Sequence, residues 1–275
     1  MLIRILSSLV LIAILAGVGF VFGSLWFNAI IALLCVLSVR EFLNAAGLSR
    51  HRWMSALAVA QAVIIPFART ELIAPVLLPV FFLIIFCYFL LMVKNFGRVS
   101  LGSMATVALF GSVVPLFFSS AVYIRDLHGV WIGGYYVLVA LGAAWLNDTF
   151  AYFVGTFLGK HKIAPVVSPK KTVEGTLGGV VLCTAAVIPL SMLVANIFGN
   201  ASINILPLVL VTPLFAIIGM LGDLTASAIK REYGVKDFGR IMPGHGGVMD
   251  RFDSALFTLP AVYVLTRYFE LITIH

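Results

Sequence analysis

Long apolar runs alternate with short polar segments along almost the whole chain. The runs are about 17 to 25 residues long, the length that an α-helix needs to cross the hydrocarbon of a bilayer. A membrane β-barrel would show segments of about ten residues with alternating polarity instead. The pattern predicts an all-α fold, a polytopic helical membrane protein with about nine transmembrane helices. The expected spans are residues 4–22, 25–43, 53–68, 71–93, 101–123, 131–157, 173–197, 204–231 and 251–273.

Two of these assignments have alternatives. The first apolar run, from Ile5 to Phe22, follows a single basic residue, as a signal peptide does. We favour a retained span, because the run is long and no small-x-small cleavage site follows it. The third and fourth spans can also form a hairpin that does not fully cross the membrane, because prolines and charges crowd their junction. The crowding residues are Pro66, Arg69, Glu71, Pro75 and Pro79.

Composition agrees with the membrane reading. Charged residues make up only 11% of the chain and hydrophobic ones 62%, whereas ordinary soluble domains carry about 25% charged residues. The three cysteines, Cys35, Cys87 and Cys183, lie apart inside apolar runs. No two of them have the spacing of a metal or redox pair, so we interpret them as small buried hydrophobic residues.

Lysine and arginine fall mostly on one side of the nine-span arrangement. That side carries 15 of the 18 basic residues, and the other side carries only Arg69, Arg125 and Arg267. Basic loops stay in the cytoplasm during insertion, so the richer side is expected there. The net charge of +7 is mostly this cytoplasmic face, and we expect no nucleic-acid partner.

Acidic residues separate the two halves of the chain. Residues 1–130 contain only three acids, and residues 131–275 contain the other eight. We therefore expect residues 1–130 to form N-terminal structural helices with lipid or dimer contacts. Residues 131–275 are expected to form the C-terminal catalytic region with its cytoplasmic loops.

The segment 227–253 concentrates charge between two apolar runs. It reads SAIKREYGVKDFGRIMPGHGGVMDRFD and holds five of the 18 basic residues and four of the 11 acidic ones. Charge near the hydrocarbon is costly, and ionisable residues there usually mark a functional site. Both signs of charge occur together with glycines and a histidine, a mixture that suits a metal ion and a phosphorylated substrate.

The eighth span carries an acid inside the membrane. Asp223, Ser227, Lys230 and Arg231 follow one another at helical spacing, so they share one helix face. An isolated ionised aspartate there is expensive, so Asp223 needs a cation. The alternative to a functional role is a structural ion pair with a base on a neighbouring helix.

A second pair of acids opens the ninth span. Asp250 and Asp253 are three residues apart and project to the same side of a helix. They can also be simple caps, because a helix N-terminus favours negative charge. The preceding segment Pro243–Gly247 is a flexible glycine-rich turn whose N–H groups can cradle a phosphate. His245 in that turn can be a phosphate donor, a general acid or a satisfied loop residue.

Two further candidates lie upstream. Asp148 lies near the cytoplasmic end of the sixth span, beside Asn147. Ser168–Pro169 is typical of a helix start, which would put Lys170 and Lys171 in the first turn, where the helix dipole disfavours them. A bound phosphate would remove that penalty. The alternative is simple anchoring of a basic cytoplasmic loop.

Together these groups predict a membrane-embedded phosphoryl or nucleotidyl transfer that depends on Mg²⁺. Acids from two or three helices can hold this hard cation, which prefers carboxylate and phosphate oxygens. The bases can neutralise a polyphosphate. The residues alone do not identify a substrate.

The segment 227–253 resembles the signature of the phosphatidate cytidylyltransferases, also called CDP-diacylglycerol synthases. An upstream block is similar to a second motif of that family, and the likeness covers roughly residues 140–275. The upstream block comprises Asn147-Asp148-Thr149, Gly159-Lys160 and Ser168-Pro169-Lys170-Lys171-Thr172-x-Glu174-Gly175. The matched signature positions are Ser227, Lys230, Arg231, Lys236, Asp237, Gly239, Pro243, Gly244, His245, Gly246, Gly247, Asp250, Arg251 and Asp253.

This resemblance implies an Mg²⁺-dependent nucleotidyltransferase. It would convert CTP and phosphatidic acid to CDP-diacylglycerol and pyrophosphate in phospholipid biosynthesis. It also implies a multi-pass inner-membrane enzyme among membrane lipids, with its active site facing the cytoplasm, that forms a homodimer. Metal ligands would be Asp223 and Asp250, with Asp253 and Asp148 as further ligands. Phosphate and substrate binding would fall to Asn147, Lys170, Lys171, Ser227, Lys230, Arg231, Lys236, His245, Gly246, Gly247 and Arg251. The catalytic residues would be Asp223, Lys230, Arg231, Asp250, Arg251 and Asp253.

Two other functions remain open on the sequence alone. A CTP-dependent polyprenol or lipid kinase would release CDP and not pyrophosphate. A cation-coupled transporter would use Asp148 and Asp223 as ion sites near the midplane. Both acids, however, accompany phosphate-type bases near the cytoplasmic side, which favours the transferase.

Overall fold

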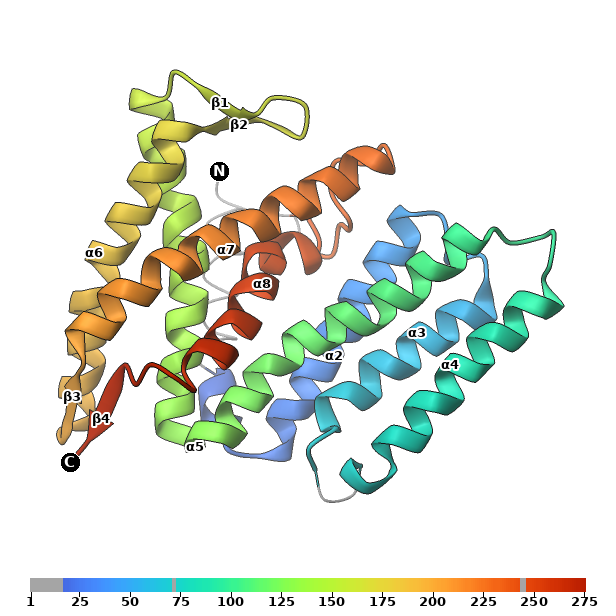
Figure 1. Ribbon diagram of the computed structural model, residues 1–275, viewed down its shortest axis with the longest axis horizontal. Coiled ribbons are helices and arrows are strands. Elements are labelled where there is room, and N and C mark those ends of the chain that lie inside the picture. Colours follow the sequence, from blue (N-terminus) through green and yellow to red (C-terminus); the bar gives the residue numbers. More distant parts are fainter. Residues whose placement is uncertain (1–16, 71–72, 243–245) are drawn as a thin grey trace. The chain divides into compact units, whose positions relative to one another are not determined.

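The computed structural model describes residues 17–70, 73–242 and 246–275. Apolar helices of membrane-spanning length dominate it, and four short strands join them (Figure 1). The helices are α2 (Leu25–Ala45), α3 (Arg52–Ile64), α4 (Leu77–Lys94), α5 (Leu101–Leu158), α6 (Val173–Phe198), α7 (Ile205–Glu232) and α8 (Met249–Leu265), with 3₁₀ turns η1 (Ile65–Phe67) and η2 (Ala74–Val76). The strands are β1 (Lys162–Ala164), β2 (Ser168–Thr172), β3 (Ala201–Ile203) and β4 (Ile272–Ile274).

The chain divides into two compact units. Unit 1 comprises residues 1–123 and 235–251, and unit 2 comprises residues 124–234 and 252–275. The second part of unit 1 is the central portion of the charged signature segment. The assignment of structural and catalytic roles to residues 1–130 and 131–275 stays a prediction, because compactness does not report function.

Unit 1 is built on α2, which packs against α3. Its apolar stripe of Cys35, Val39 and Phe42 is fully buried, at the spacing of one helix face. Polar side chains inside this unit are paired. Gln61 donates to Ser112 Oγ at 2.8 Å and accepts from the Tyr88 hydroxyl at 3.2 Å. A buried amide without such partners would be costly.

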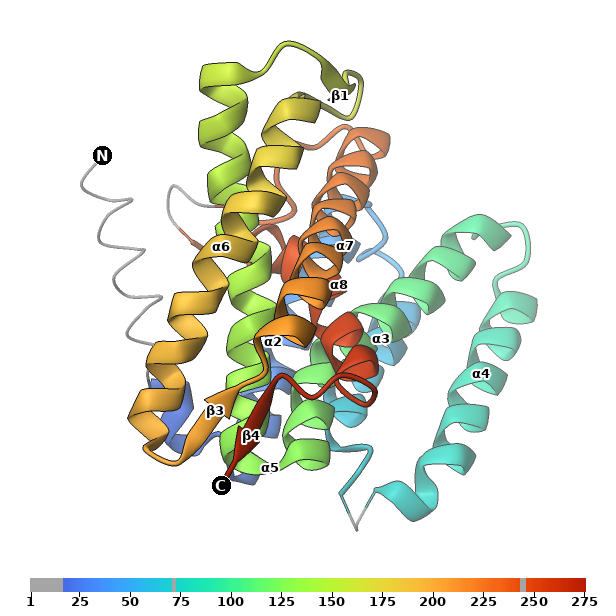
Figure 2. The ribbon, with the colours of Figure 1, turned by 60° about the vertical axis from the view of Figure 1, so that its left-hand side comes forward.

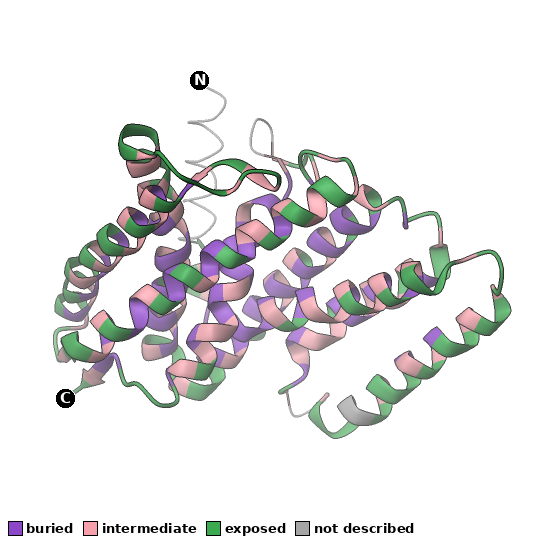
Figure 3. Cartoon of the chain, turned by 45° about the horizontal axis from the view of Figure 1, so that its top comes forward, coloured by how far each residue is buried: buried purple, intermediate pink, exposed green. Residues whose placement is uncertain are grey.

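The α4 helix is covered on only a small part of its surface. Figure 3 shows it mostly exposed, and its phenylalanines, including Phe82 at 62% exposure and Phe89 at 59%, face outward, whereas Tyr88 is buried. A helix that is apolar all round and uncovered is the expected form of a lipid-facing element.

Unit 2 joins the rest of α5 to α6, α7 and α8. Gly129 interrupts α5 with φ 78° and ψ 177°, so the long helix is two helices joined at a kink. The two predicted spans 101–123 and 131–157 fall on either side of this glycine. In addition, α6 packs against α7, and β3 pairs with β4 close to the C-terminus (Figure 2).

The length and apolar composition of the helices confirm the expected helical membrane fold. Four of the described helices, α2, α5, α6 and α7, are long and apolar enough to cross a membrane. The shorter apolar helices, which cover residues 52–67 and 79–94, correspond to the third and fourth expected spans. Most of the first expected span, residues 4–22, lies outside the described residues. The count of nine stays a prediction.

The ninth expected span, 251–273, is wrong at its C-terminal end. The helix ends at Leu265, and the chain turns to form β4 beside β3. The Asn204 side chain stabilises the turn by donating to Glu270 O at 2.9 Å. Pairing of Ile272–Ile274 with Ala201–Ile203 satisfies backbone groups that a helix would have bonded locally.

Candidate functional site

Three carboxylates and two lysines meet inside unit 2. We call Asp148 on α5, Lys171 on β2, Asp223 and Lys230 on α7, and Asp253 on α8 the ion-pair cluster. Lys171 contacts the Asp223 carboxylate directly, and its Nζ lies 3.9 Å from Asp148 Oδ1. Lys230 Nζ lies 3.8 Å from Asp253 Oδ2. All five side chains were candidates from the sequence, and the structure brings them together.

The cluster is largely shielded from solvent. The side chains of Lys230 and Asp253 are only 12% and 11% exposed, so their attraction is screened less than that of a surface pair. The Ser254 hydroxyl donates to Asp148 Oδ2 at 2.7 Å, which holds this carboxylate in place. Three acids and two lysines thus lie together in a half-buried site.

A hairpin delivers Lys171. Strands β1 and β2 are antiparallel, and β2 contacts both α6 and α7. The expected helix start at Ser168–Pro169 is wrong, because Ser168–Thr172 is strand β2 and α6 begins only at Val173. The physical reason is the cap, since the Thr172 side chain accepts from Gly175 N at 3.1 Å. Lys171 therefore reaches the acids from a strand and not from a helix N-terminus.

Glu174 fixes the other end of this hairpin. Its carboxylate accepts from the backbone N–H groups of Lys160 at 3.0 Å and His161 at 3.1 Å. It also pairs with the His161 ring. An acid in the first turn of a helix is favoured by the helix dipole. The hairpin that carries Lys170 and Lys171 is thereby tied to the start of α6.

Glycines let the helices of the cluster approach closely. A Cβ on Gly222 of α7 would lie 2.7 Å from the carbonyl oxygen of Asp253, and one on Gly219 would lie 2.9 Å from Thr258 Cγ2. On the α5–α6 side, a Cβ on Gly175 would lie 2.7 Å from Ala151 O. Small residues at such contacts are typical of helix pairs in membranes. They bring the acids of α5, α7 and α8 within reach of the same lysines.

Asn147 serves the packing of unit 2. It is only 1% exposed, and its Nδ2 donates to Ala216 O at 3.2 Å. Its Oδ1 is buried without a hydrogen-bond partner among the described residues. The expected role in substrate binding stays a prediction.

Other candidates from the sequence lie outside the ion-pair cluster. Lys170, Arg231 and Lys236 are exposed, and Ser227 is half-buried. Of the residues expected to share one face of α7, Asp223 and Lys230 belong to the cluster, whereas Arg231 is exposed to solvent. His245 and the neighbouring Pro243 and Gly244 lie outside the described residues.

In unit 1, the signature loop forms a network of its own. Asp250 Oδ2 accepts from Phe238 N at 2.8 Å and from Gly247 N at 3.0 Å. Gly246 has φ 84°, a conformation that favours glycine. A Cβ there would lie 3.0 Å from Asp250 Oδ2. Asp250 therefore organises the loop, and Arg251 beside it is half-buried.

Glu41 is the residue that sequence reasoning missed. It is 5% exposed, and its two carboxylate oxygens accept from Val248 N and Met249 N, each at 3.0 Å. It thus caps the start of α8 from α2. Glycines make room for it, because a Cβ on Gly239 or Gly247 would overlap its carboxylate. The available signal was an acid at the end of an otherwise apolar span.

The carboxylates of the cluster do not form a ready-made metal cage. Within residues 17–70, 73–242 and 246–275, no group of three or more His, Cys, Asp or Glu side chains lies close enough to hold a metal ion. Magnesium, however, is usually held by only one or two carboxylates together with substrate phosphates. Lys171, between Asp148 and Asp223, already shows that a cation is accommodated there. Carboxylate oxygens suit this hard cation, and the expected Mg²⁺ site stays a prediction.

Comparisons with known proteins point to one family. A model of the cytidylyltransferase family matches residues 2–269. The phosphatidate cytidylyltransferase of Staphylococcus haemolyticus is 50% identical over 133 residues, which cover 48% of this chain and 49% of that protein. That of Staphylococcus aureus is 48% identical over 133 residues, with the same two shares. That of Staphylococcus epidermidis is 50% identical over 130 residues, 47% of this chain and 48% of that protein.

The chain spans about half the length of the curated relatives it matches. The family match, in contrast, extends over nearly all of the chain. The resemblance seen in the signature segment and the upstream block is therefore confirmed. The chain belongs to the cytidylyltransferase family.

Proposed function

We propose that the protein transfers the cytidylyl group of CTP to phosphatidic acid, which gives CDP-diacylglycerol and pyrophosphate. The observation that carries this proposal is the ion-pair cluster of unit 2. It combines acids suited to a hard cation with lysines suited to phosphates, on apolar helices that can hold a lipid substrate. Family membership and the names of the relatives support the same reaction.

In this reaction a phosphate oxygen of the lipid forms a bond to the α-phosphorus of CTP. The bond from the α-phosphorus to the bridging oxygen breaks, and pyrophosphate leaves with the electron pair. The attacking group is already an anion, so the protein needs no strong general base. Its task is to position two phosphates that repel each other and to stabilise the charge that develops.

Lysines and carboxylates divide this work. Lys171 and Lys230 lie beside the three carboxylates and offset charge on the phosphates. The exposed bases Lys170 and Arg231 are proposed to bind the outer phosphates of CTP, and a phosphate-binding role of Lys236 in unit 1 is proposed from the family resemblance alone. Their exposure suits a soluble substrate that enters from the cytoplasm.

Magnesium would be held by Asp223, with Asp148 and Asp253 as further ligands. Bound there, it would neutralise negative charge on the phosphates. Asp250 was expected to share this role, but in unit 1 it accepts two backbone N–H groups. Its contribution as a ligand remains a proposal.

We also propose how the protein lies in the membrane. The charge distribution supports a multi-pass, nine-span arrangement in the inner membrane with the site facing the cytoplasm. CTP is soluble there, and phosphatidic acid presents its head group at the same boundary. The family resemblance supports a homodimer.

The products distinguish this proposal from its rivals. Purified protein in detergent with CTP, phosphatidic acid and MgCl₂ is expected to release one pyrophosphate for each CDP-lipid formed, and no CDP. Chromatography of the aqueous phase measures both products. Release of CDP would identify a lipid kinase. No CTP turnover, together with ion-driven uptake in proteoliposomes, would identify a transporter.

A further inference from the structure

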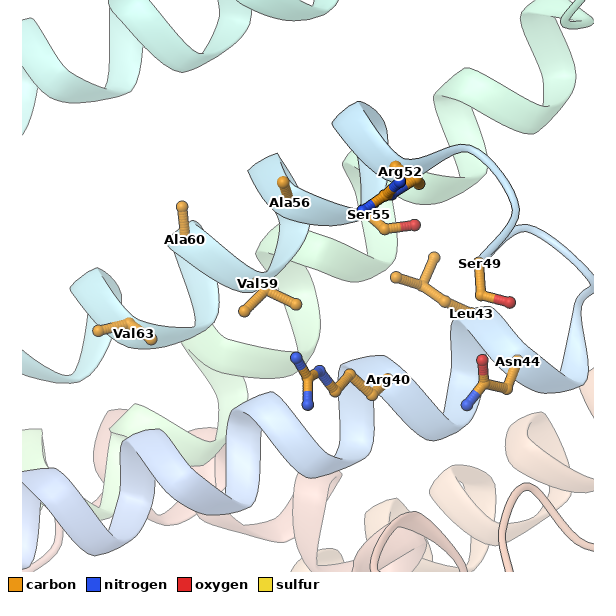
Figure 4. Close-up of a pocket in the computed structure, with 10 residues that line it drawn as sticks. All are labelled: Arg40, Leu43, Asn44, Ser49, Arg52, Ser55, Ala56, Val59, Ala60 and Val63. Atoms are coloured by element: carbon orange, nitrogen blue, oxygen red, sulfur yellow. The ribbon is translucent and has the colours of Figure 1, made fainter.

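An open groove of about 700 Å³ runs between α2 and α3 in unit 1. We call it the α2–α3 groove. Its volume falls within the usual range for small-molecule sites, about 300–1,000 Å³. Figure 4 shows Arg40 reaching from α2 into the space beside Val59, with Arg52, Ser55 and Ser49 gathered at one end.

The lining changes from polar to apolar along α3. Arg52 and Ser55 come first, and Ala56, Val59 and Val63 follow on the same face. From Arg52 to Val63 the helix rises about 16 Å at 1.5 Å per residue. This matches half of a hydrocarbon core about 30 Å thick, which is the depth of one lipid monolayer. The α3 side of the groove therefore passes from a polar end to an apolar one, and Arg40 of α2 lies beside Val59 partway along it.

The two arginines are available for an anionic ligand. Both are exposed, and no ion pair to either is present among the described residues. Glu41, the acid next to Arg40, is already bonded to backbone groups of residues 248 and 249. None of the described residues that line the groove is acidic. Arginine forms bidentate bonds with phosphate oxygens, so two of them make a selective phosphate site.

We propose that the α2–α3 groove binds an anionic phospholipid. The head-group phosphate lies between Arg40 and Arg52, and one acyl chain continues past Val59 toward Val63. Basic pockets between transmembrane helices on the cytoplasmic side are known to bind anionic lipid head groups. This site lies in unit 1 and uses no residue of the ion-pair cluster. The inference rests on the membrane location and does not depend on the transferase reaction.

Binding of phosphatidylglycerol and phosphatidylcholine to the purified chain tests the proposal, with native mass spectrometry in detergent as the measurement. The double variant Arg40→Gln/Arg52→Gln is expected to weaken phosphatidylglycerol binding by about tenfold or more, since each base near a lipid surface contributes appreciably. Phosphatidylcholine binding should change little. Ala60→Trp keeps the charge but fills the apolar end, and it should weaken phosphatidylglycerol binding too.

The matched control is Arg50→Gln/Arg98→Gln. It removes the same charge from two exposed arginines outside the groove, and phosphatidylglycerol binding should stay within about twofold of the unaltered protein. An equal loss in both double variants would overturn the proposal in favour of general attraction to a basic face. Unchanged binding in the Arg40/Arg52 variant and in Ala60→Trp would also overturn it. Thermal unfolding confirms that each variant is folded.

Discussion

Replacing Asp223 with Asn is expected to lower cytidylyl transfer by about 100-fold or more. The change keeps the size of the side chain and removes its charge, so Lys171 loses its closest carboxylate. Loss of one preorganised electrostatic group in an active site costs about 10² to 10³ in rate. The proposed metal would also lose a ligand, so the MgCl₂ concentration for half-maximal rate should rise. Initial rates across a MgCl₂ series measure both effects.

Asp126→Asn is the matched control for this change. Asp126, on α5, is likewise an aspartate with an ion pair, since Arg125 Nη2 lies 2.7 Å from its Oδ1. It belongs to no part of the ion-pair cluster, and its variant should keep the normal rate and MgCl₂ dependence. Near-normal turnover of a folded Asp223→Asn protein would remove the cluster from the mechanism.

Glu41→Gln is expected to destabilise the protein and slow the reaction together. The amide can accept one of the two N–H groups now bonded to the carboxylate, and its own NH₂ faces the other donor. Hydrogen bonds to charged groups contribute about 1.5–3 kcal/mol each, so the free energy of unfolding should fall by about that amount. The apparent Tm, followed by tryptophan fluorescence, should fall by several degrees.

The expected fall in reaction rate of Glu41→Gln is separate from its loss of stability. The loop that Glu41 anchors carries Asp250 and the signature residues, so kcat should fall at temperatures where the variant is fully folded. Glu41→Asp keeps the charge and should recover part of the rate. Glu232→Gln, at the exposed end of α7, should leave both Tm and kcat unchanged. A Glu41→Gln protein with normal Tm and normal kcat would contradict the anchoring role.

The spans were predictable because bilayer thickness sets their length. Helix α2 was expected at 25–43 and covers Leu25–Ala45, and α6 was expected at 173–197 and covers Val173–Phe198. The end of α8 was not predictable in this way. Ile272–Ile274 is apolar enough to continue a helix, and only its pairing with β3, about 70 residues earlier, makes it a strand.

The candidate site, like the fold, was predictable only in part. Asp148, Lys171, Asp223, Lys230 and Asp253 stand out because charge is rare in this chain, so sequence alone proposed them. Their pairing was not predictable, since Lys171 reaches Asp223 through a hairpin that resembled a helix start. Glu41 was missed because its partners are backbone groups more than 200 residues away, which leave no side-chain pattern.

The most direct test of the account follows the phosphates of CTP. Purified protein is incubated with phosphatidic acid, MgCl₂ and CTP labelled at either the α- or the γ-phosphate, and the lipid phase is counted. The account predicts that only the α-label enters the lipid and that Asp223→Asn nearly abolishes this transfer. Label from the γ-phosphate in the lipid, or α-label transfer that Asp223→Asn leaves intact, would contradict it.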